Sequence, residues 1–374
     1  MNTVPKYVPA LRWKGAEIEA VRGLDAATKE HIQPLFELVP KDFQTPDKPN
    51  AVAPPVEYVI AKNAKLMGDN WGLRAPFFID FVHLDKVMVP TALEAFDRNA
   101  SHYGLKAILV TTLTPAVEVM MLRKLNIVKE HGLCIRIDVF EFRQGGFHRA
   151  LIGLVKNLWL IPGNVDLVID FGVNPEGPEG IQKILDMIPT AEGDWRSVTV
   201  LGGSLPKNLS KLRKNEIHLL QRTEWLGWRR YALAGGTAWF GDYTIQHPIF
   251  EDAEGKHFNF SASIRYTSEA NTVIVRGEKV QGDDGLGYEQ WPANAQILCG
   301  LEEHFRGAEF SVGDRFIKEM GEQQAKTGGP KDWLFAGINH HLTLVVYQLT
   351  HIEATVDQAI SLDADQPDWP ARMG

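Results

Sequence analysis

Four apolar runs in the first half of the chain each carry an acidic residue at or near their C-terminal end. The runs are Leu35–Leu38, Phe77–Phe81, Ile135–Val139 and Leu167–Phe171, and their acidic residues are Glu37, Asp80, Asp138 and Asp170. Nearly continuous apolar runs are typical of strands covered on both faces, as in a parallel sheet wrapped by helices. Such folds bind ligands at the C-terminal ends of their strands. The four carboxylates are therefore expected near one site, where a cation, an arginine or shared protons must offset their repulsion.

Similar runs recur along the chain with helix-sized gaps between them. Eight strands are expected, at Leu35–Val39, Phe77–Phe81, Ala107–Leu113, Cys134–Phe140, Val165–Phe171, Ser197–Leu201, Glu216–Gln221 and Ala238–Thr244. Their starts fall roughly 20–40 residues apart, which is the repeat of βα units. The pattern predicts an α/β fold, a TIM-like (β/α)8 barrel. A doubly wound open sheet is the alternative, and the absence of a glycine-rich fingerprint after the first strand disfavours it.

The last third of the sequence predicts an addition to the barrel. A β-hairpin is expected from Ser263–Thr267 and Thr272–Val275, then helical stretches near Ala293–Phe305 and Asp314–Lys326, then the apolar run His340–Leu349. No linker-like stretch divides these elements from the barrel. We therefore expect residues 1–249 to form the barrel and residues 250–374 to form a hairpin and helical extension packed on it.

Composition narrows the class of protein. The 39 basic and 47 acidic residues give a net charge of −8, and no block of consecutive Lys or Arg offers a nucleic-acid or membrane-surface footprint. No apolar run approaches the ~20 residues that span a bilayer. The segment Met1–Lys6 lacks the apolar core of a signal peptide. Cys134 lies inside an apolar strand and is expected to be a buried hydrophobe. The sequence predicts a soluble cytoplasmic protein without generic nucleic-acid binding.

Short motifs spread over most of the chain resemble one known family. They are Tyr7–Gly15 (YVPALRWKG), Pro34–Glu37, Phe240–Tyr243, Ser263–Thr267 with Val275–Gly277, and Gly337–His341. Together they resemble the "beta protein" family of phages and bacteria. The resemblance implies no particular reaction. It implies a genetic context, because members of this family tend to be found with mobile elements and phage-defence genes.

The strand-end carboxylates are candidate ligands of a divalent cation. Mg²⁺ and Mn²⁺ favour carboxylate oxygens, so Glu37, Asp80, Asp138 and Asp170 are the predicted metal ligands. Asp138 and Asp170 form the best pair, because their strands are consecutive and each lies in an otherwise apolar run. The alternative is that the acids cap the following loops or pair with the arginines Arg12, Arg74 and Arg136.

Further candidates complete a predicted catalytic site. Asp242 and Tyr243 end the last expected strand and are expected to point into the same mouth as Asp138 and Asp170, although an ordinary Gly-Asp turn explains the motif as well. Guanidinium groups bind phosphate bidentately. The predicted substrate-binding residues are therefore Arg136, Arg265 and Arg276, with pairing to the acidic excess of the fold as the alternative.

The remaining motifs give weaker evidence for a function. Gly202-Gly203-Ser204 could present backbone N–H groups to an anion, but a plain turn explains it as well. His341 is expected to pack within a helix, because His340 and His341 would point about 100° apart. Zinc-ligand spacings, a GxSxG elbow and a Walker A sequence are absent from the sequence. Serine-hydrolase and P-loop chemistry are therefore not expected.

Two classes of function remain open. The first is a metal-assisted hydrolase or lyase acting on a phosphorylated or nucleotide-like substrate. The second is a non-catalytic protein-interaction component of a phage-defence or toxin–antitoxin-like module. An enzyme requires at least two of the carboxylates within roughly 4–6 Å of each other in an open pocket. A binding protein would show them neutralised by arginines, with an exposed apolar patch elsewhere.

Overall fold

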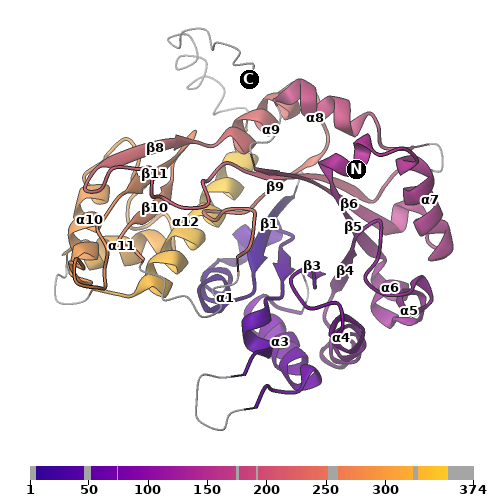
Figure 1. Cartoon of the computed structure of the whole chain (residues 1–374). Helices are drawn as coiled ribbons and strands as arrows, with labels where there is room; N and C mark the ends of the chain where they lie inside the picture. Colours follow the sequence, from indigo (N-terminus) through magenta and orange to yellow (C-terminus); the bar gives the residue numbers. More distant parts are fainter. Residues whose placement is uncertain are drawn as a thin grey trace.

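Eight parallel strands close into a barrel in the order β1-β2-β3-β4-β5-β6-β7-β9 (Figure 1). The structure is a computed structural model that describes residues 6–45, 52–73, 75–173, 177–190, 193–251, 260–322 and 327–352. The strands are β1 (Tyr7–Arg12), β2 (Leu35–Glu37), β3 (Phe77–Asp80), β4 (Ala107–Thr111), β5 (Leu133–Asp138), β6 (Val165–Val173), β7 (Ser197–Gly203) and β9 (Trp239–Asp242). The predicted (β/α)8 barrel is confirmed.

Alternating strand residues fill the barrel interior. One buried cluster gathers inward-facing side chains from seven of the strands, among them Val8, Leu35, Phe78, Cys134 and Val168. The alternate residues point outward and pack under the helices in a second, larger cluster. Strands that are apolar on both faces are what this double burial requires. The full burial of Cys134 confirms its predicted role as a core residue.

Helices surround the barrel on its outer side (Figure 1). They are α1 (Gly15–Arg22), α2 (Ala26–Glu30), α3 (Val56–Asn70), α4 (Val89–Tyr103), α5 (Val119–Lys124), α6 (Asn126–His131), α7 (Phe147–Asn157), α8 (Pro178–Leu185) and α9 (Thr223–Leu233). Short 3-10 turns add η1 (Pro40–Phe43), η2 (Val139–Arg143) and η3 (Pro162–Asn164).

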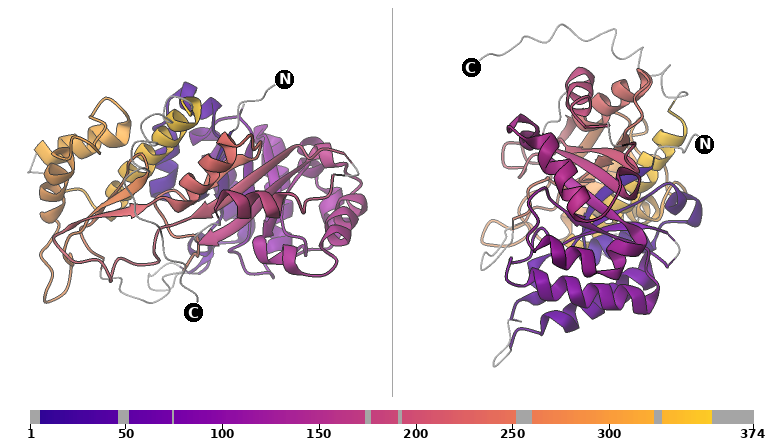
Figure 2. Two further views of the ribbon diagram at one scale, coloured as in Figure 1. Left: turned by 90° about the horizontal axis from the view of Figure 1, so that it is seen from above. Right: turned by 90° about the vertical axis from the view of Figure 1, so that its right-hand side faces the viewer.

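The extension lies against one side of the barrel, as Figure 1 and the left view of Figure 2 show. The predicted hairpin is confirmed as β10 (Ile264–Thr267) and β11 (Asn271–Val275), which pair antiparallel. Three helices accompany it: α10 (Gln290–Cys299), α11 (Val312–Glu322) and α12 (Pro330–Thr350). Helix α12 packs against β10 of the extension and against β1 and α1 of the barrel, so it joins the two.

Two strand assignments are corrected. The segment predicted as a barrel strand at Glu216–Gln221 is instead β8 (Ile217–Gln221), the edge of a three-stranded antiparallel sheet ordered β10-β11-β8. Its alternation of exposed and half-buried residues is the pattern of a strand with one solvated face. The missing barrel strand is β1, whose Pro9 interrupts the apolar run and normally disfavours a central strand. Since β8 precedes residue 250, the proposed division at residues 249 and 250 stays a prediction.

Candidate functional site at the C-terminal mouth of the barrel

One arginine organises the C-terminal mouth of the barrel. Arg136 lies in the middle of β5 and points inward, and its side chain is 13% exposed. Its Nη1 donates to Glu37 Oε1 and to Asp80 Oδ2, both at 2.8 Å. Its Nε and Nη2 donate to Asp170 Oδ2 at 3.0 and 2.9 Å, and Nη2 also donates to the Tyr243 hydroxyl at 2.8 Å. A guanidinium has five N–H donors, so all of them are engaged.

Three of the four predicted carboxylates are therefore brought together around Arg136. Each lies at the same end of its strand: Glu37 closes β2, Asp80 closes β3 and Asp170 lies near the end of β6. Strand pairing sets Glu37 beside Asp80, and Asp170 beside the last residue of β5. Closure of the barrel then lets one side chain on β5 reach across to all three.

Every oxygen of these carboxylates accepts at least one hydrogen bond. Besides the Arg136 bonds, Glu37 Oε2 lies 3.1 Å from His83 Nε2, and the Tyr243 hydroxyl donates to Asp170 Oδ2 at 2.6 Å. Backbone N–H groups complete the set: that of Val82 donates to Asp80 Oδ1, and that of Gly172 donates to Asp170 Oδ1, each at 2.9 Å. The side chains of Glu37 and Asp80 are only 2% and 7% exposed. The cluster is thus buried and preorganised.

The environment separates the acidities of Glu37 and Asp80. Burial raises the pKa of Glu37, but the charge of Arg136 and the bond to His83 outweigh it and lower this pKa to about 2. Burial also raises the pKa of Asp80. The net shift of this pKa is upward, because the charge of Glu37 opposes the lowering effect of Arg136. Burial and the neighbouring carboxylates keep the pKa of Tyr243 well above its usual range. Glu37 is therefore the fixed anion of the cluster, and Asp80 is the carboxyl that gains a proton more readily.

Arg136 lies where a cation between the carboxylates would lie. Within the described ranges, no group of three or more His, Cys, Asp or Glu side chains is arranged to hold a metal ion. A cation bound by Glu37, Asp80 and Asp170 would have to displace the guanidinium. The predicted Mg²⁺ or Mn²⁺ stays a prediction, and the observed counter-ion is the arginine that the sequence offered as the alternative. Arg74, the other alternative partner, lies outside the described residues.

Asp138 is the predicted carboxylate that the cluster leaves out. It pairs in register with Asp170 but is exposed, and the structure shows no bond between Asp138 and Arg136. Its carboxylate accepts from the Phe140 backbone N–H at 2.8 Å, and the Glu141 carboxylate accepts from the Asp138 backbone N–H at 2.9 Å. These bonds cap η2, as in a capping box. The geometry corresponds to the capping alternative for this residue.

Asp242 and Tyr243 do not point into the same mouth. Tyr243 belongs to the inner cluster, whereas Asp242 is 1% exposed and faces outward toward α12. Asp242 accepts from the Tyr7 hydroxyl at 2.6 Å and lies 2.9 Å from His341 Nε2. The reason is the strand period of two, which sends successive side chains to opposite faces. His341 is also buried and lies 2.7 Å from the Thr267 hydroxyl, as expected for a packing histidine.

The two hairpin arginines make their bonds away from the cluster. Arg265 donates to the Ile245 carbonyl at 3.0 Å. Arg276 donates to the hydroxyls of Ser261 and Ser263 and to the Gly277 carbonyl. The structure shows no bond from either guanidinium to the mouth carboxylates. Their role as phosphate ligands is therefore still a prediction. Both guanidinium groups already donate to acceptors within the protein.

The segment after β9 lies across the mouth. Arg12, at the end of β1, donates to the Gln246 side chain at 3.0 Å and to the His247 carbonyl at 2.6 Å. The Phe250 ring lies 4.6 Å from the His83 ring, centroid to centroid. Gly203 lies within β7, and a Cβ there would come within 3.0 Å of Pro248. The expected turn at Gly202-Gly203 is therefore strand, and its glycine admits the covering segment.

A cleft of about 440 Å³ opens beside Asp80. It runs between the loops that follow β3 and β4, and its lining includes Asp80, Leu84, Leu93, Val110 and Thr112. Asp80 therefore belongs both to the Arg136 cluster and to the cleft wall. Concave, mostly apolar cavities of this size with a few convergent polar groups are typical small-molecule sites.

The sequence did not single out His83. This histidine follows the acidic end of β3 by three residues, in a loop of the face that carries barrel active sites, and that position was the available signal. Arg12, an alternative partner of the carboxylates on the sequence, instead bonds Gln246 and His247 of the segment that lies across the mouth.

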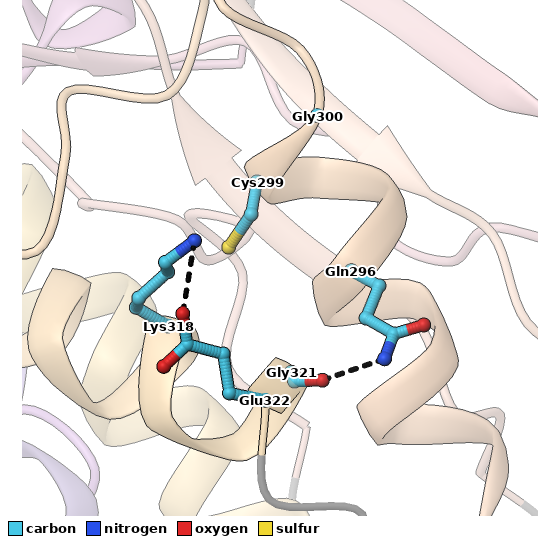
Figure 3. Close-up of a pocket in the computed structure, with 6 residues that line it drawn as sticks. All are labelled: Gln296, Cys299, Gly300, Lys318, Gly321 and Glu322. Atoms are coloured by element: carbon cyan, nitrogen blue, oxygen red, sulfur yellow. Dashed lines mark hydrogen bonds and ion pairs between the residues drawn. The ribbon is translucent and has the colours of Figure 1, made fainter.

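A smaller hollow of about 290 Å³ lies between α10 and α11 (Figure 3). Lys318 and Glu322 pair there at 3.2 Å, and the Gln296 amide donates to the Gly321 carbonyl at 2.7 Å. Burial raises the pKa of the nearby Cys299 thiol, which disfavours the reactive thiolate. The hollow therefore offers neither an unpaired charge nor an activated nucleophile.

In the described part of the chain, no helix combines the length and apolar character needed to cross a membrane.

Comparison with known proteins identifies a family and several solved structures with a similar barrel. Among curated proteins, none matches the chain. Solved structures similar to this chain include the YdjI aldolase from Escherichia coli K12 (10% identity, TM-score 0.36, 92% of this chain and 91% of that chain). They also include the N-terminal domain of a putative aldolase from Bacteroides vulgatus (12%, 0.37, 95% and 99%).

A third similar structure is a putative dihydrodipicolinate synthase family protein from Coccidioides immitis (12% identity, TM-score 0.32, 64% of this chain and 67% of that chain). At these identities and scores the neighbours carry nothing about reaction or substrate. The family comparison is stronger, because the sequence model of the family described as "Beta protein" matches residues 7–347. The resemblance seen in the motifs is confirmed, and the chain belongs to the Beta protein family.

Proposed function

We propose that the protein is an enzyme, a hydrolase or lyase, in which Asp80 exchanges a proton with a small ligand. The observation that carries the proposal is the position of Asp80, which is shared by the buried Arg136 cluster and the cleft wall. Two neighbouring carboxylates whose pKa values are pushed apart are a recurrent arrangement of acid–base catalysts. Asp80, with its raised pKa, is the proton carrier, and Glu37 is the permanent anion.

The other members of the cluster are positioning residues. Arg136 holds Asp80 and Glu37 with a single nitrogen, which fixes the direction of the Asp80 carboxylate. Tyr243 and Asp170 hold the opposite side of the guanidinium. Because Arg136 has no N–H to spare, it orders the site and does not itself receive a phosphate. Preorganised groups of this kind stabilise developing charge without rearranging during the reaction.

Three finer parts of the hypothesis keep the status of predictions. They are the divalent cation, the phosphorylated or nucleotide-like substrate, and the phage-defence or mobile-element context. The first two lack a supporting contact among the described residues, because the carboxylates are bonded to Arg136 and the hairpin arginines to other acceptors. The third rests on the family resemblance alone.

A non-catalytic interaction protein is the second candidate, and two observations favour it. Each mouth carboxylate already accepts a hydrogen bond from Arg136. In addition, the edge strand β8 exposes Ile217 and Leu219, at 43% and 51%. Exposed apolar residues on an unpaired strand edge are a means of binding another chain. The open cleft at Asp80 makes the enzyme the better-supported candidate.

Deuterium incorporation from solvent tests the enzyme proposal without knowledge of the substrate. Wild type, Asp80→Asn and the surface control Asp69→Asn would each be incubated in D₂O with mixtures of small molecules, followed by mass spectrometry. The expected result is label uptake or cleavage of a ligand with wild type and the control, and its loss with Asp80→Asn. Turnover that survives Asp80→Asn would contradict the assigned role. No turnover with wild type across broad mixtures would favour the interaction protein.

A further inference from the structure

The cleft beside Asp80 is apolar along most of its wall. Its side chains come from the segment after β3 (Leu84), from helix α4 (Val89 and Leu93), from β4 (Leu109) and from α5 (Leu122). Each of these five residues is less than 9% exposed and belongs to the packed core, so the wall is preformed. A rigid apolar cavity favours an apolar group of a ligand, because binding removes that group from water without ordering the protein.

The polar end of the cleft carries an excess of negative charge. Asp80 lines this end, and Glu37 and Asp170 share the guanidinium of Arg136 with it. His83 Nε2 also lies 3.1 Å from Glu37 Oε2. Arg12 lies close enough to Glu37 to interact with its charge, although burial dominates and lowers the pKa of Arg12. Counting both guanidinium groups, three carboxylates face two permanent positive charges, and His83 adds a third only if it is protonated. A buried negative excess is relieved by a proton or by a cationic ligand.

Resting on the function proposed above, we infer that the ligand is a primary amine whose ammonium group is placed at Asp80 and whose alkyl or aryl group fills the cleft. Asp80 Oδ1 accepts from the Val82 backbone N–H and Oδ2 accepts from Arg136, and each oxygen keeps a second lone pair for an ammonium N–H. Lys86 also lines the cleft, but this residue is exposed, where solvent and salt screen its charge. The polar and apolar parts of this one cavity together select an amine with an apolar group.

Binding of a homologous series to the full-length protein tests this inference by calorimetry. The probes are propylamine, butylamine, pentylamine and hexylamine, compared with hexanol, hexanoate and hexyl phosphate. Each methylene buried in the cleft is expected to tighten the Kd about fourfold, from ~0.8 kcal/mol per methylene. The ammonium is expected to bind at least about tenfold more tightly than either anion of the same length, given the charge of the site.

Two variants, Ala116→Trp and Asp80→Asn, test the apolar and the polar part of the cleft separately, and Ala234→Trp is the control for the first. Ala116→Trp adds an indole to an exposed position of the cleft lining, and Ala234→Trp places the same side chain on an exposed position at the end of α9. The first is expected to remove the dependence on chain length, and the control to keep it. Asp80→Asn is expected to weaken hexylamine more than hexanol. Thermal unfolding of each variant verifies that it is folded.

The outcomes distinguish this inference from the proposed function. Amines that bind with the expected chain-length dependence but show no turnover would support the ligand class and count against the enzyme. Hexyl phosphate or hexanoate binding more tightly than hexylamine would overturn the inference and restore an anionic substrate. Affinity that is unchanged in Ala116→Trp would also overturn it, because the apolar group would then lie elsewhere.

Discussion

Replacing Arg136 with methionine removes the guanidinium that is bonded to all three mouth carboxylates and keeps an unbranched apolar stem. The cost follows from the structure. The Glu37 pKa is lowered from 4.5 to about 2, and a shift of that size corresponds to about 3 kcal/mol. Removing one partner of a buried ion pair typically costs about 3–5 kcal/mol. Arg136→Met is therefore expected to lower the free energy of unfolding at neutral pH by about 3–5 kcal/mol.

The pH dependence gives this loss a signature. A carboxyl with a depressed folded-state pKa stabilises the protein above its unfolded pKa, and this contribution is lost as the pH falls toward the folded value. In wild type, Glu37 therefore stabilises the fold down to about pH 4.5 and loses this contribution toward pH 2. Without Arg136, burial raises the carboxyl pKa values instead. The variant should gain stability on acidification from neutral pH, so the gap to wild type narrows.

Urea unfolding at about pH 7 and about pH 5 measures both effects, provided that unfolding is two-state. The control is Arg213→Met, since the Arg213 side chain is 84% exposed and lies 3.7 Å from Glu216. An exposed pair is worth about 0–1 kcal/mol, so this variant should differ little from wild type at either pH. The reasoning would be refuted if Arg136→Met lost less than about 1 kcal/mol, the range of a surface pair, or if its deficit were the same at both pH values.

Three further substitutions test separate parts of the structure. Tyr243→Phe removes the hydroxyl bonded to Asp170 and should lower stability by about 1–3 kcal/mol in urea titrations, whereas an unchanged midpoint would count against this bond. Burial raises the Glu224 pKa to about 7. Its ionisation therefore costs stability as the pH rises from 4.5 to about 7, and Glu224→Gln should gain on wild type across that window by up to about 3 kcal/mol. Equal pH profiles would exclude this cost. In Gly313→Ala the new Cβ would lie 2.1 Å from a carbonyl oxygen of α12, so the free energy of unfolding should fall by about 1–3 kcal/mol, seen as a lower melting temperature. The control Gly153→Ala, where the space is open, should not destabilise the protein.

The barrel and the convergence of its acids could be predicted from the sequence, because both follow from short-range patterns. Apolar runs ending in Glu37, Asp80 and Asp170 indicate buried parallel strands, and parallel closure brings their ends together. The strand count was correct although one strand was misassigned. Pro9 obscures β1, and the alternation in β8 resembles any strand until its partner is known.

The composition of the site could not be read in the same way, because it depends on orientations that a single residue step reverses. Asp242 and Tyr243 are adjacent, and the pleat of β9 sends them to opposite faces. Asp138 and Asp170 are paired in register, yet the chain turns after Asp138 and uses it as a cap. The choice of Arg136 as counter-ion depends on contacts between residues as far apart as Glu37 and Tyr243. Spacing along the chain does not specify such contacts.

The central claim is that the mouth holds two carboxyls of opposite character, a fixed anion at Glu37 and a proton carrier at Asp80. Carbon-13 NMR titration of labelled Glu and Asp carboxyls, assigned with Glu37→Gln and Asp80→Asn, tests it most directly. The account predicts that the pKa of Asp80 lies above its ordinary 3.8. It also predicts that Glu37 stays ionised to a lower pH than Asp80, with a pKa of about 2. Both carboxyls titrating at their ordinary values, or Asp80 titrating below Glu37, would contradict the account.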